Sequence, residues 1–188
     1  GSRFEIWQVV GQTRAVSLLQ HSLERGTLAH AYLLVGPHHV GKMTLALNLA
    51  QALNCDAAEP PCGVCASCQK IASAKHADVQ IIGLSQSEDS AEAGSRKEIS
   101  IDQIREMQHS SSLPPFEGRC KVFIIDGAEF LSTEAANCLL KTLEEPVDRV
   151  VFILLTANDR LLPATVVSRC QRLELAPLAA GEVEAALC

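Results

Sequence analysis

The fold is decided by the stretch GPHHVGKM, residues 36–43. It follows the phosphate-binding pattern GxxxxGK(S/T) up to the last position, where Met43 stands in place of serine or threonine. An apolar run at 31–35 precedes it, and a helical pattern at 43–53 follows it. Strand, glycine-rich loop and helix are the context in which this motif binds phosphate. The stretch therefore predicts a phosphate-binding loop at the end of a buried strand.

The loop supplies most of what a nucleotide site needs. Backbone N–H groups and the following helix N-terminus would hold phosphate oxygens, and Lys42 would reach the outer phosphates. The Mg²⁺-binding hydroxyl is missing, because the thioether of Met43 is a poor ligand for a hard cation. Thr44 is turned about 100° further around the helix, so we do not expect it to substitute. The expected nucleotide-binding residues of the loop are Gly36, Pro37, Val40, Gly41, Lys42, Met43 and Thr44.

Apolar runs and helical patterns alternate along the chain, which predicts an α/β fold with a parallel sheet covered on both faces. Buried strands are expected at 31–35, 79–82, 121–125 and 150–155. Helices are expected at 12–25, 43–53, 101–109 and 133–143. Ser100 is expected to cap the third of these helices, with Gln103 at the capping-box position. The polar segment 85–98 reads as a surface loop.

The composition limits the class of protein. The chain has 188 residues, 47% of them hydrophobic, which is enough for one ordinary domain with a real core. Its net charge of -6 argues against broad, nonspecific coating of DNA. No apolar stretch approaches the roughly 20 residues that span a bilayer, so we expect no membrane contact and a cytoplasmic location. Eight cysteines in such a compartment favour a metal site or buried thiols over disulfides.

Four of the cysteines are closely spaced in the pattern C-x6-C-x2-C-x2-C. Four thiolates at this spacing suit tetrahedral Zn²⁺, and a site filled by four sulfurs leaves no position for water or substrate. We therefore expect a structural zinc that holds a small insertion at about 55–70, with an iron–sulfur cluster or a redox pair as alternatives. The expected metal ligands are Cys55, Cys62, Cys65 and Cys68. The remaining cysteines are expected to be small, partly buried residues.

Polar residues at two strand ends complete the candidate site. Asp126 ends an apolar strand, where nucleotidases of this architecture place an aspartate that orients Mg²⁺ or its water. The glutamate that usually follows, and that polarises the attacking water, is replaced by Gly127; Glu129 is not expected to reach the phosphate. The Mg²⁺-binding hydroxyl and the general base are thus both missing, which indicates that the chain has lost ATP hydrolysis. Thr156 and Asn158 follow another strand, where they would either sense a γ-phosphate or simply cap the turn.

Short segments spread over residues 4–177, besides the loop and the cysteine cluster, form a recognisable set: VGQ (10–12), HAY (30–32), IDQIR (101–105), PFEGR (115–119), AAN (135–137), LLKTLEEP (139–146) and SRC (168–170). Together they resemble the clamp-loader subunits of bacterial DNA polymerase III, members of the AAA+ class, and in particular their delta-prime type. The segment IDQIRE and the incomplete nucleotide site favour the delta-prime type, whereas SRC and LLKTLEEP are shared with the tau/gamma ATPase subunit.

The resemblance implies a P-loop AAA+ domain over 1–177, with a five-stranded parallel sheet and a small zinc-bound insertion. Residues 178–188 would begin a lid domain that is otherwise absent from this chain. Family members form a five-subunit ring with tau/gamma and delta subunits, which opens a sliding clamp and places it on primed DNA. By itself Arg169 reads as a surface charge, but the resemblance implies that it serves in trans at the ATP site of the adjacent subunit.

The resemblance also bears on the chain's own nucleotide site. It leaves ATP or ADP binding open, since the loop glycines and Lys42 remain, and it places Val9 and Val10 where the adenine pocket begins. His38 and His39 are either solvent-facing or narrow the pocket. The competing interpretations are an active tau/gamma-type clamp-loader ATPase and a zinc-dependent interaction module that no longer uses nucleotide.

Overall fold

The computed structural model describes residues 13–38, 40–58, 60–84 and 98–176. Within them, five strands form one sheet in the order β2-β3-β4-β1-β5, and every neighbouring pair is parallel. The five-stranded parallel sheet is therefore confirmed. The strands are β1 (Ala31–Val35), β2 (Val79–Ile82), β3 (Lys121–Asp126), β4 (Val150–Thr156) and β5 (Gln171–Glu174).

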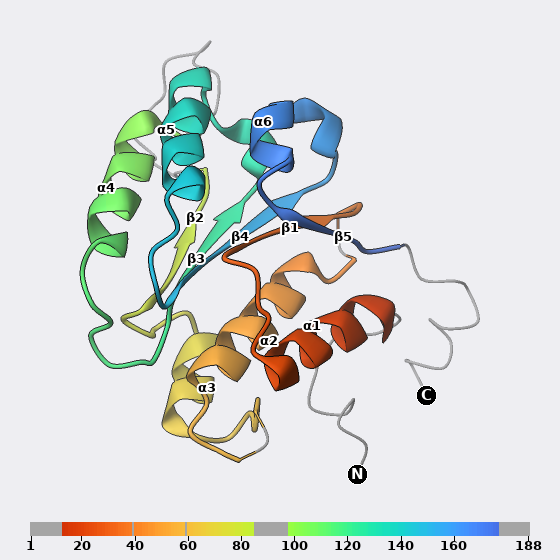
Figure 1. Ribbon diagram of the computed structural model, residues 1–188, viewed down its shortest axis with the longest axis vertical. Helices are drawn as coiled ribbons and strands as arrows, with labels where there is room; N and C mark the ends of the chain where they lie inside the picture. Colours follow the sequence, from red (N-terminus) through yellow and green to blue (C-terminus); the bar gives the residue numbers. More distant parts are fainter. Residues whose placement is uncertain (1–12, 39, 59, 85–97, 177–188) are drawn as a thin grey trace.

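Helices cover both faces of the sheet. Figure 1 shows α1, α2 and α3 on one face and α4, α5 and α6 on the other. None of the helices in the described ranges is long and apolar enough to cross a membrane. The helices are α1 (Thr13–Arg25), α2 (Lys42–Asn54), α3 (Ala66–Ala72), α4 (Ile101–Ser111), α5 (Thr133–Glu144) and α6 (Ala164–Val167), with short 3-10 turns at η2 (Ala128–Phe130) and η3 (Asp159–Leu161).

Two apolar clusters fill the space between the sheet and its helices. One joins the sheet to α1, α2 and α3, and the other joins it to α4, α5 and α6. Every residue of β1 and of β4 is buried, as expected for central strands covered on both faces. Phe123 and Phe152 stack across neighbouring strands, with ring centroids 5.5 Å apart. The long apolar runs are thus the central strands, and these strands position the loops that follow their ends.

The predicted helices and strands agree with the structure to within two residues at each end. The capping box is also confirmed, since Ser100 accepts from the backbone of Gln103 and the Gln103 side chain reaches back to Ser100. Three elements had no prediction from periodicity, namely α3, α6 and β5. Several predictions lie outside the described residues. They are the loop at 85–98 except for its last residue, the adenine-pocket residues Val9 and Val10, His39, Cys188 and the start of a lid at 178–188.

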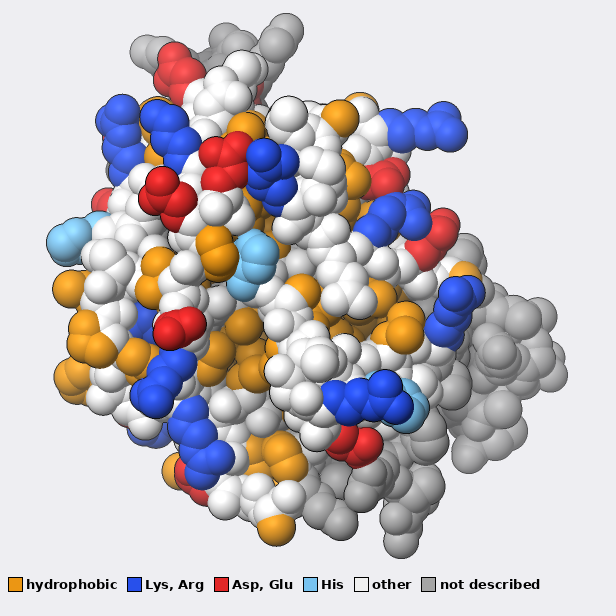
Figure 2. Space-filling view, viewed as in Figure 1, with side chains coloured by type: hydrophobic (Ala, Val, Ile, Leu, Met, Phe, Trp, Pro, Cys, Tyr) orange, Lys and Arg blue, Asp and Glu red, His pale blue; other side chains and the backbone are white. Residues whose placement is uncertain are grey.

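Charged side chains of both signs are interspersed on the face shown in Figure 2. Lysine and arginine side chains lie next to aspartate and glutamate side chains there, and no continuous basic strip crosses the described part of this face.

Candidate functional site

The phosphate loop connects β1 to α2, as predicted. The backbone N–H of Gly36 donates to the carbonyl of Thr156 at 3.1 Å, which ties the start of the loop to the end of β4. A Cβ at Gly36 would lie 2.5 Å from the carbonyl oxygen of Leu175, so this close approach needs glycine. Gly41 has φ 102°, a left-handed conformation that also favours glycine, and α2 begins directly after it. Both motif glycines therefore have a backbone reason to be glycine.

The loop opens onto a cleft of about 500 Å³ at the carboxyl edge of the sheet. Because β1, β3 and β4 are parallel, their carboxyl ends meet at this edge. The cleft is lined by Lys42, Asp126 and Thr156 from three separate segments, together with His38. A neighbouring hollow of about 390 Å³ is lined by Gly41, Lys42, Met43 and Thr44. The structure thus brings most of the predicted nucleotide-site residues together.

Three predicted loop and strand-end residues have other roles in the structure. Val40 is buried, and Met43, which lines the smaller hollow, also packs against the apolar cluster that contains Val40. The side chain of Asn158 accepts from the backbone N–H of Arg160 at 3.0 Å and so caps η3. The alternatives for this strand end were sensing of a γ-phosphate and capping of the turn. Asn158 caps the turn, whereas Thr156 lines the cleft.

The ammonium group of Lys42 is held by the loop itself. It donates to the carbonyl oxygen of Gly36 and, at 3.0 Å, to that of Pro37. Burial lowers the pKa of Lys42, although the carboxylates of Glu129 and Asp126 favour its charged form. Lys42 therefore places a positive charge in a cleft that also contains the carboxylates of Asp126 and Glu129.

Glu129 was expected to have no path to the phosphate site, and this expectation is wrong. Glu129 lines the same cleft as Lys42, and its Oε2 accepts from the Thr156 hydroxyl at 2.6 Å. The cause is the turn after Asp126, where Gly127 takes φ 84° and the chain folds into η2. A glycine directly after a strand-end aspartate is the sequence signal that fits this turn.

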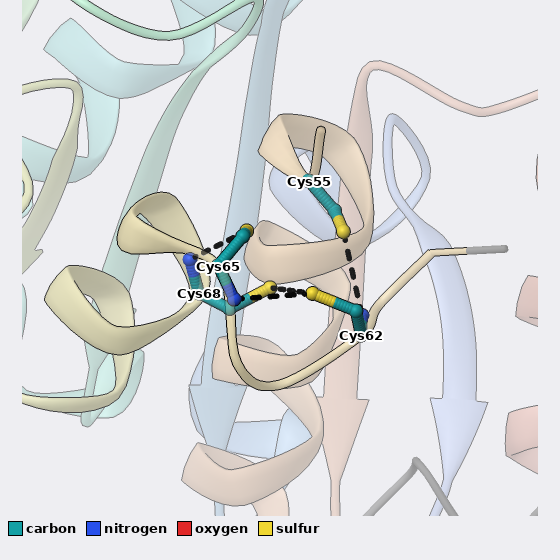
Figure 3. A group of neighbouring side chains, drawn as sticks. All are labelled: Cys55, Cys62, Cys65 and Cys68. Carbon is teal, nitrogen blue, oxygen red and sulfur yellow. Dashed lines mark hydrogen bonds between the residues drawn. The ribbon is translucent and has the colours of Figure 1, made fainter. Parts of the chain in front are cut away.

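The four clustered cysteines come together as predicted. Their sulfur atoms all lie within 4.8 Å of one another, and those of Cys62 and Cys68 are 3.9 Å apart. In Figure 3, Cys55 follows the end of α2 and Cys62 lies on the connecting loop. Cys65 is the N-cap residue of α3, and Cys68 lies in the first turn of that helix. Zn–S bonds of about 2.3 Å place tetrahedral sulfurs about 3.8 Å apart, so the donor set fits a Cys₄ zinc site with small adjustments.

Backbone N–H groups surround the sulfurs in the way that thiolate ligands require. Five N–H groups donate to the sulfurs of Cys55, Cys62 and Cys65 at 3.2 to 3.4 Å. Donation from Asp56 and Cys68 lowers the pKa of the Cys65 thiol to about 6, whereas burial raises that of Cys68 to about 12. A bound cation would offset this burial, because it stabilises thiolates that the apolar surroundings disfavour.

The cysteine insertion is anchored to the main domain. The side chain of Gln51 in α2 donates to the carbonyl oxygen of Cys68 at 2.9 Å, and Ile71 of α3 is fully buried in the main core. Lys70 also pairs with Glu117 at 2.8 Å. A metal at this place would fix a short segment against the end of α2, whereas the phosphate loop lies at the start of that helix. The other described cysteines, Cys120, Cys138 and Cys170, are buried or half-buried.

Arg169 lies away from the phosphate loop. It follows α6 and precedes β5, whose first residue, Gln171, pairs with Tyr32 near the start of β1. The loop instead follows the end of β1. Arg169 is held by Glu144, with 2.9 Å between Nη2 and Oε1, and borders an open hollow that His30 and Pro146 also line. The structure therefore separates the predicted arginine from the predicted nucleotide residues.

Comparisons with known proteins agree with this architecture. The family model described as DNA polymerase III, delta subunit, matches residues 11–179. DNA polymerase III subunit tau of Escherichia coli (strain K12) is 37% identical over 172 residues, which cover 90% of this chain and 25% of that protein. Subunit delta' of Bacillus subtilis (strain 168) is 35% identical over 177 residues, which cover 92% of this chain and 50% of that protein. The chain thus spans a quarter to a half of the length of these relatives.

Solved structures support the fold. A gamma subunit-related protein from Thermotoga maritima superimposes with a TM-score of 0.58 at 22% identity, covering 87% of this chain and 47% of that one. The RuvB Holliday junction branch migration motor from the same organism gives 0.55 at 20% identity, covering 94% and 49%. At 20–22% identity these structures show a shared fold and no more. The family membership of the chain rests instead on the family model and the more similar sequence relatives. The chain belongs to the DNA polymerase III clamp-loader family that includes the delta', tau and gamma subunits.

Proposed function

We propose that this chain acts as a delta-prime-type clamp-loader subunit, which supplies Arg169 to the ATP site of a neighbouring subunit and does not itself hydrolyse ATP. The observation that carries the proposal is the placement of Arg169 at the sheet edge opposite its own phosphate loop. Gln171 pairs with Tyr32, four residues before the loop begins at Gly36. At a rise of about 3.3 Å per residue, that separation is about 13 Å along the strand.

A phosphate held by this chain's own loop is therefore out of reach of Arg169. The guanidinium is half-exposed and faces an open hollow, so a phosphate carried by another chain can approach it. A planar guanidinium suits this task, because it binds two phosphate oxygens at once and remains charged. Such an arginine stabilises the charge on a transferring phosphoryl group.

Two features support the loss of hydrolysis in the chain's own cleft. Met43 takes the place of the Mg²⁺-binding hydroxyl and is used in core packing. Gly127 takes the place of the glutamate that polarises water, and its left-handed conformation serves the turn into η2. Neither residue thus offers an oxygen ligand for Mg²⁺ or a base for the attacking water.

The partners follow from the family. A delta-prime-type chain would assemble with tau/gamma and delta subunits into a ring that loads the sliding clamp on primed DNA, in the cytoplasm. The cysteine cluster would hold one structural Zn²⁺ through Cys55, Cys62, Cys65 and Cys68. The metal would supply cross-linking of the insertion and no chemistry on the nucleotide.

The test is DNA-dependent ATP hydrolysis by a loader reconstituted with the full protein. Arg169→Ala should remove the neighbouring site's share of turnover, since an arginine finger contributes about 10³-fold or more at its site. Arg160→Ala, an exposed arginine in η3, is the matched control and should leave turnover unchanged. Equal turnover in the two variants would contradict the role of Arg169.

A second candidate function is an active ATPase of the tau/gamma type. The observation in its favour is Glu129, a carboxylate in the same cleft as Lys42 that could stand in for the missing base. Hydrolysis of ATP by the purified full protein, stimulated by primed DNA and abolished by Lys42→Ala, would favour this function. Absence of turnover under those conditions would favour the delta-prime type.

A further inference from the structure

The groups expected to bind the outer phosphates are both engaged by acceptors of the protein itself. Lys42 donates to two loop carbonyls. The Thr156 hydroxyl, at 2.6 Å from Glu129 Oε2, has a single proton to donate. Its oxygen also accepts from the backbone N–H of Asn158 at 3.2 Å. Thr156 therefore cannot donate to a γ-phosphate while Glu129 holds its proton.

Glu129 has a fixed place beside Thr156. The turn η2 is closed by a hydrogen bond from Phe130 to Gly127 at 2.9 Å. On its other side, the backbone N–H of Ile99 donates to the carbonyl of Phe130 at 2.7 Å. Thr156 itself is only 1% exposed at the end of a central strand. Hydrogen bonds therefore hold the turn that contains Glu129, and its carboxylate contacts the buried end of β4.

The charge of the cleft disfavours additional anionic groups. Among its described lining residues, Lys42 faces the two carboxylates of Asp126 and Glu129, with His38 nearby. A nucleoside triphosphate brings one more anionic group than a diphosphate. Mg²⁺ normally neutralises that group, but the hydroxyl that would hold the ion is replaced by Met43.

We propose that Glu129 makes this cleft selective for a nucleoside diphosphate over a triphosphate. Its carboxylate accepts the hydrogen bond that the Thr156 hydroxyl would otherwise donate to a γ-phosphate. The negative charge of the carboxylate also repels a γ-phosphate at that place. A diphosphate has no γ-phosphate and needs only the loop amides and Lys42, so it meets less of this repulsion than a triphosphate does. The inference rests on the proposed function, in which this cleft does not hydrolyse ATP, and it adds that the cleft binds a diphosphate as its resting ligand.

The experiment is titration calorimetry of the full protein with ADP and with ATP, both without Mg²⁺. In Glu129→Gln the charge is gone but the shape and an acceptor for Thr156 remain. Removing a charge within a few ångströms of the γ-phosphate should strengthen ATP binding about tenfold. ADP binding should change by less than about twofold. Glu134→Gln, which removes an exposed charge five residues further along, is the matched control and should change neither.

A second variant keeps the test informative if the first is poorly folded. Glu129→Ala removes the charge and this acceptor, and leaves the Thr156 hydroxyl only the longer hydrogen bond to the Asn158 carbonyl oxygen at 3.2 Å. Its gain in ATP binding should therefore be at least as large. The proposal is overturned if both nucleotides gain equally, if neither changes, or if ATP binding weakens. It is also overturned if none of these proteins binds ADP. Each of these outcomes is independent of Arg169→Ala, which tests the proposed function on the neighbouring subunit.

Discussion

Arg169 and Glu144 form an ion pair at the sheet edge opposite the phosphate loop, with 2.9 Å between Nη2 and Oε1. Glu144 ends α5, and Arg169 follows α6, so the pair joins two helices on the same face of the sheet. Both side chains are half-exposed, at 38% and 44%. Exposed pairs of this kind contribute about 0–1 kcal/mol. The arginine can therefore exchange its carboxylate for a phosphate at little cost.

Glu144→Gln should raise the ATP hydrolysis of a reconstituted loader by up to about fivefold, because the arginine no longer has to leave a competing carboxylate. The melting temperature should hardly change. Steady-state hydrolysis with primed DNA measures the effect, with Glu145→Gln, the exposed neighbour, as the control. A loss of turnover as large as that of Arg169→Ala would show instead that Glu144 positions the arginine.

Removal of the metal should loosen the insertion and leave the sheet folded. Chelation, or Cys65→Ser, removes a constraint on the segment from Cys55 to Ala72, while the core on both sheet faces is buried elsewhere. Amide hydrogen exchange should rise in that segment alone, and elemental analysis should give one zinc per chain before chelation. Cys138→Ser, outside the cluster, should keep its zinc. Unfolding of the whole domain on chelation would contradict a local role.

Asp78 should matter for stability in a pH-dependent way. Its buried carboxylate accepts three backbone N–H groups, from Phe116, Glu117 and Gly118, at 2.6 to 2.7 Å. Burial by itself raises the pKa of Asp78, but these donors together outweigh it, and its pKa lies below the usual value. Asp78→Asn should therefore cost about 1–3 kcal/mol of unfolding free energy at neutral pH.

The sign of the pH effect follows from the lowered pKa. The stabilisation by Asp78 is complete above its unfolded pKa of about 3.9 and is lost as the pH falls through the lower folded value. Denaturant unfolding at several pH values should show the difference between wild type and Asp78→Asn shrinking below about pH 4. Asp148→Asn, an exposed acid, is the control. A difference that persists unchanged at acid pH would exclude the charge as its cause.

Local patterns predicted the parts of the molecule that depend on local sequence. Central parallel strands are buried on both faces, so β1, β3 and β4 appear as continuous apolar runs. The cysteine cluster was predictable because its four ligands lie within one short segment. In contrast, β5 has only Leu173 buried, and α3 and α6 are seven and four residues long, too short to show a helical period.

The contacts that sequence reasoning missed depend on distant segments. Glu129 reaches the cleft only because the turn at Gly127 brings it to Thr156, which is 27 residues away in the chain. The pair between Arg169 and Glu144 likewise needs the packing of α5 against α6. Periodicity and spacing carry no information about either contact, since both are set by how strands and helices pack.

Comparing Lys42→Ala with Arg169→Ala in the reconstituted clamp loader separates the two roles of the chain most directly. Lys42 belongs to its own cleft, and Arg169 lies at the opposite sheet edge. DNA-dependent ATP hydrolysis should stay within about twofold of wild type in Lys42→Ala, whereas Arg169→Ala should remove the turnover of the neighbouring site. The opposite pattern, in which turnover falls in Lys42→Ala and persists in Arg169→Ala, would contradict a subunit that contributes its arginine in trans.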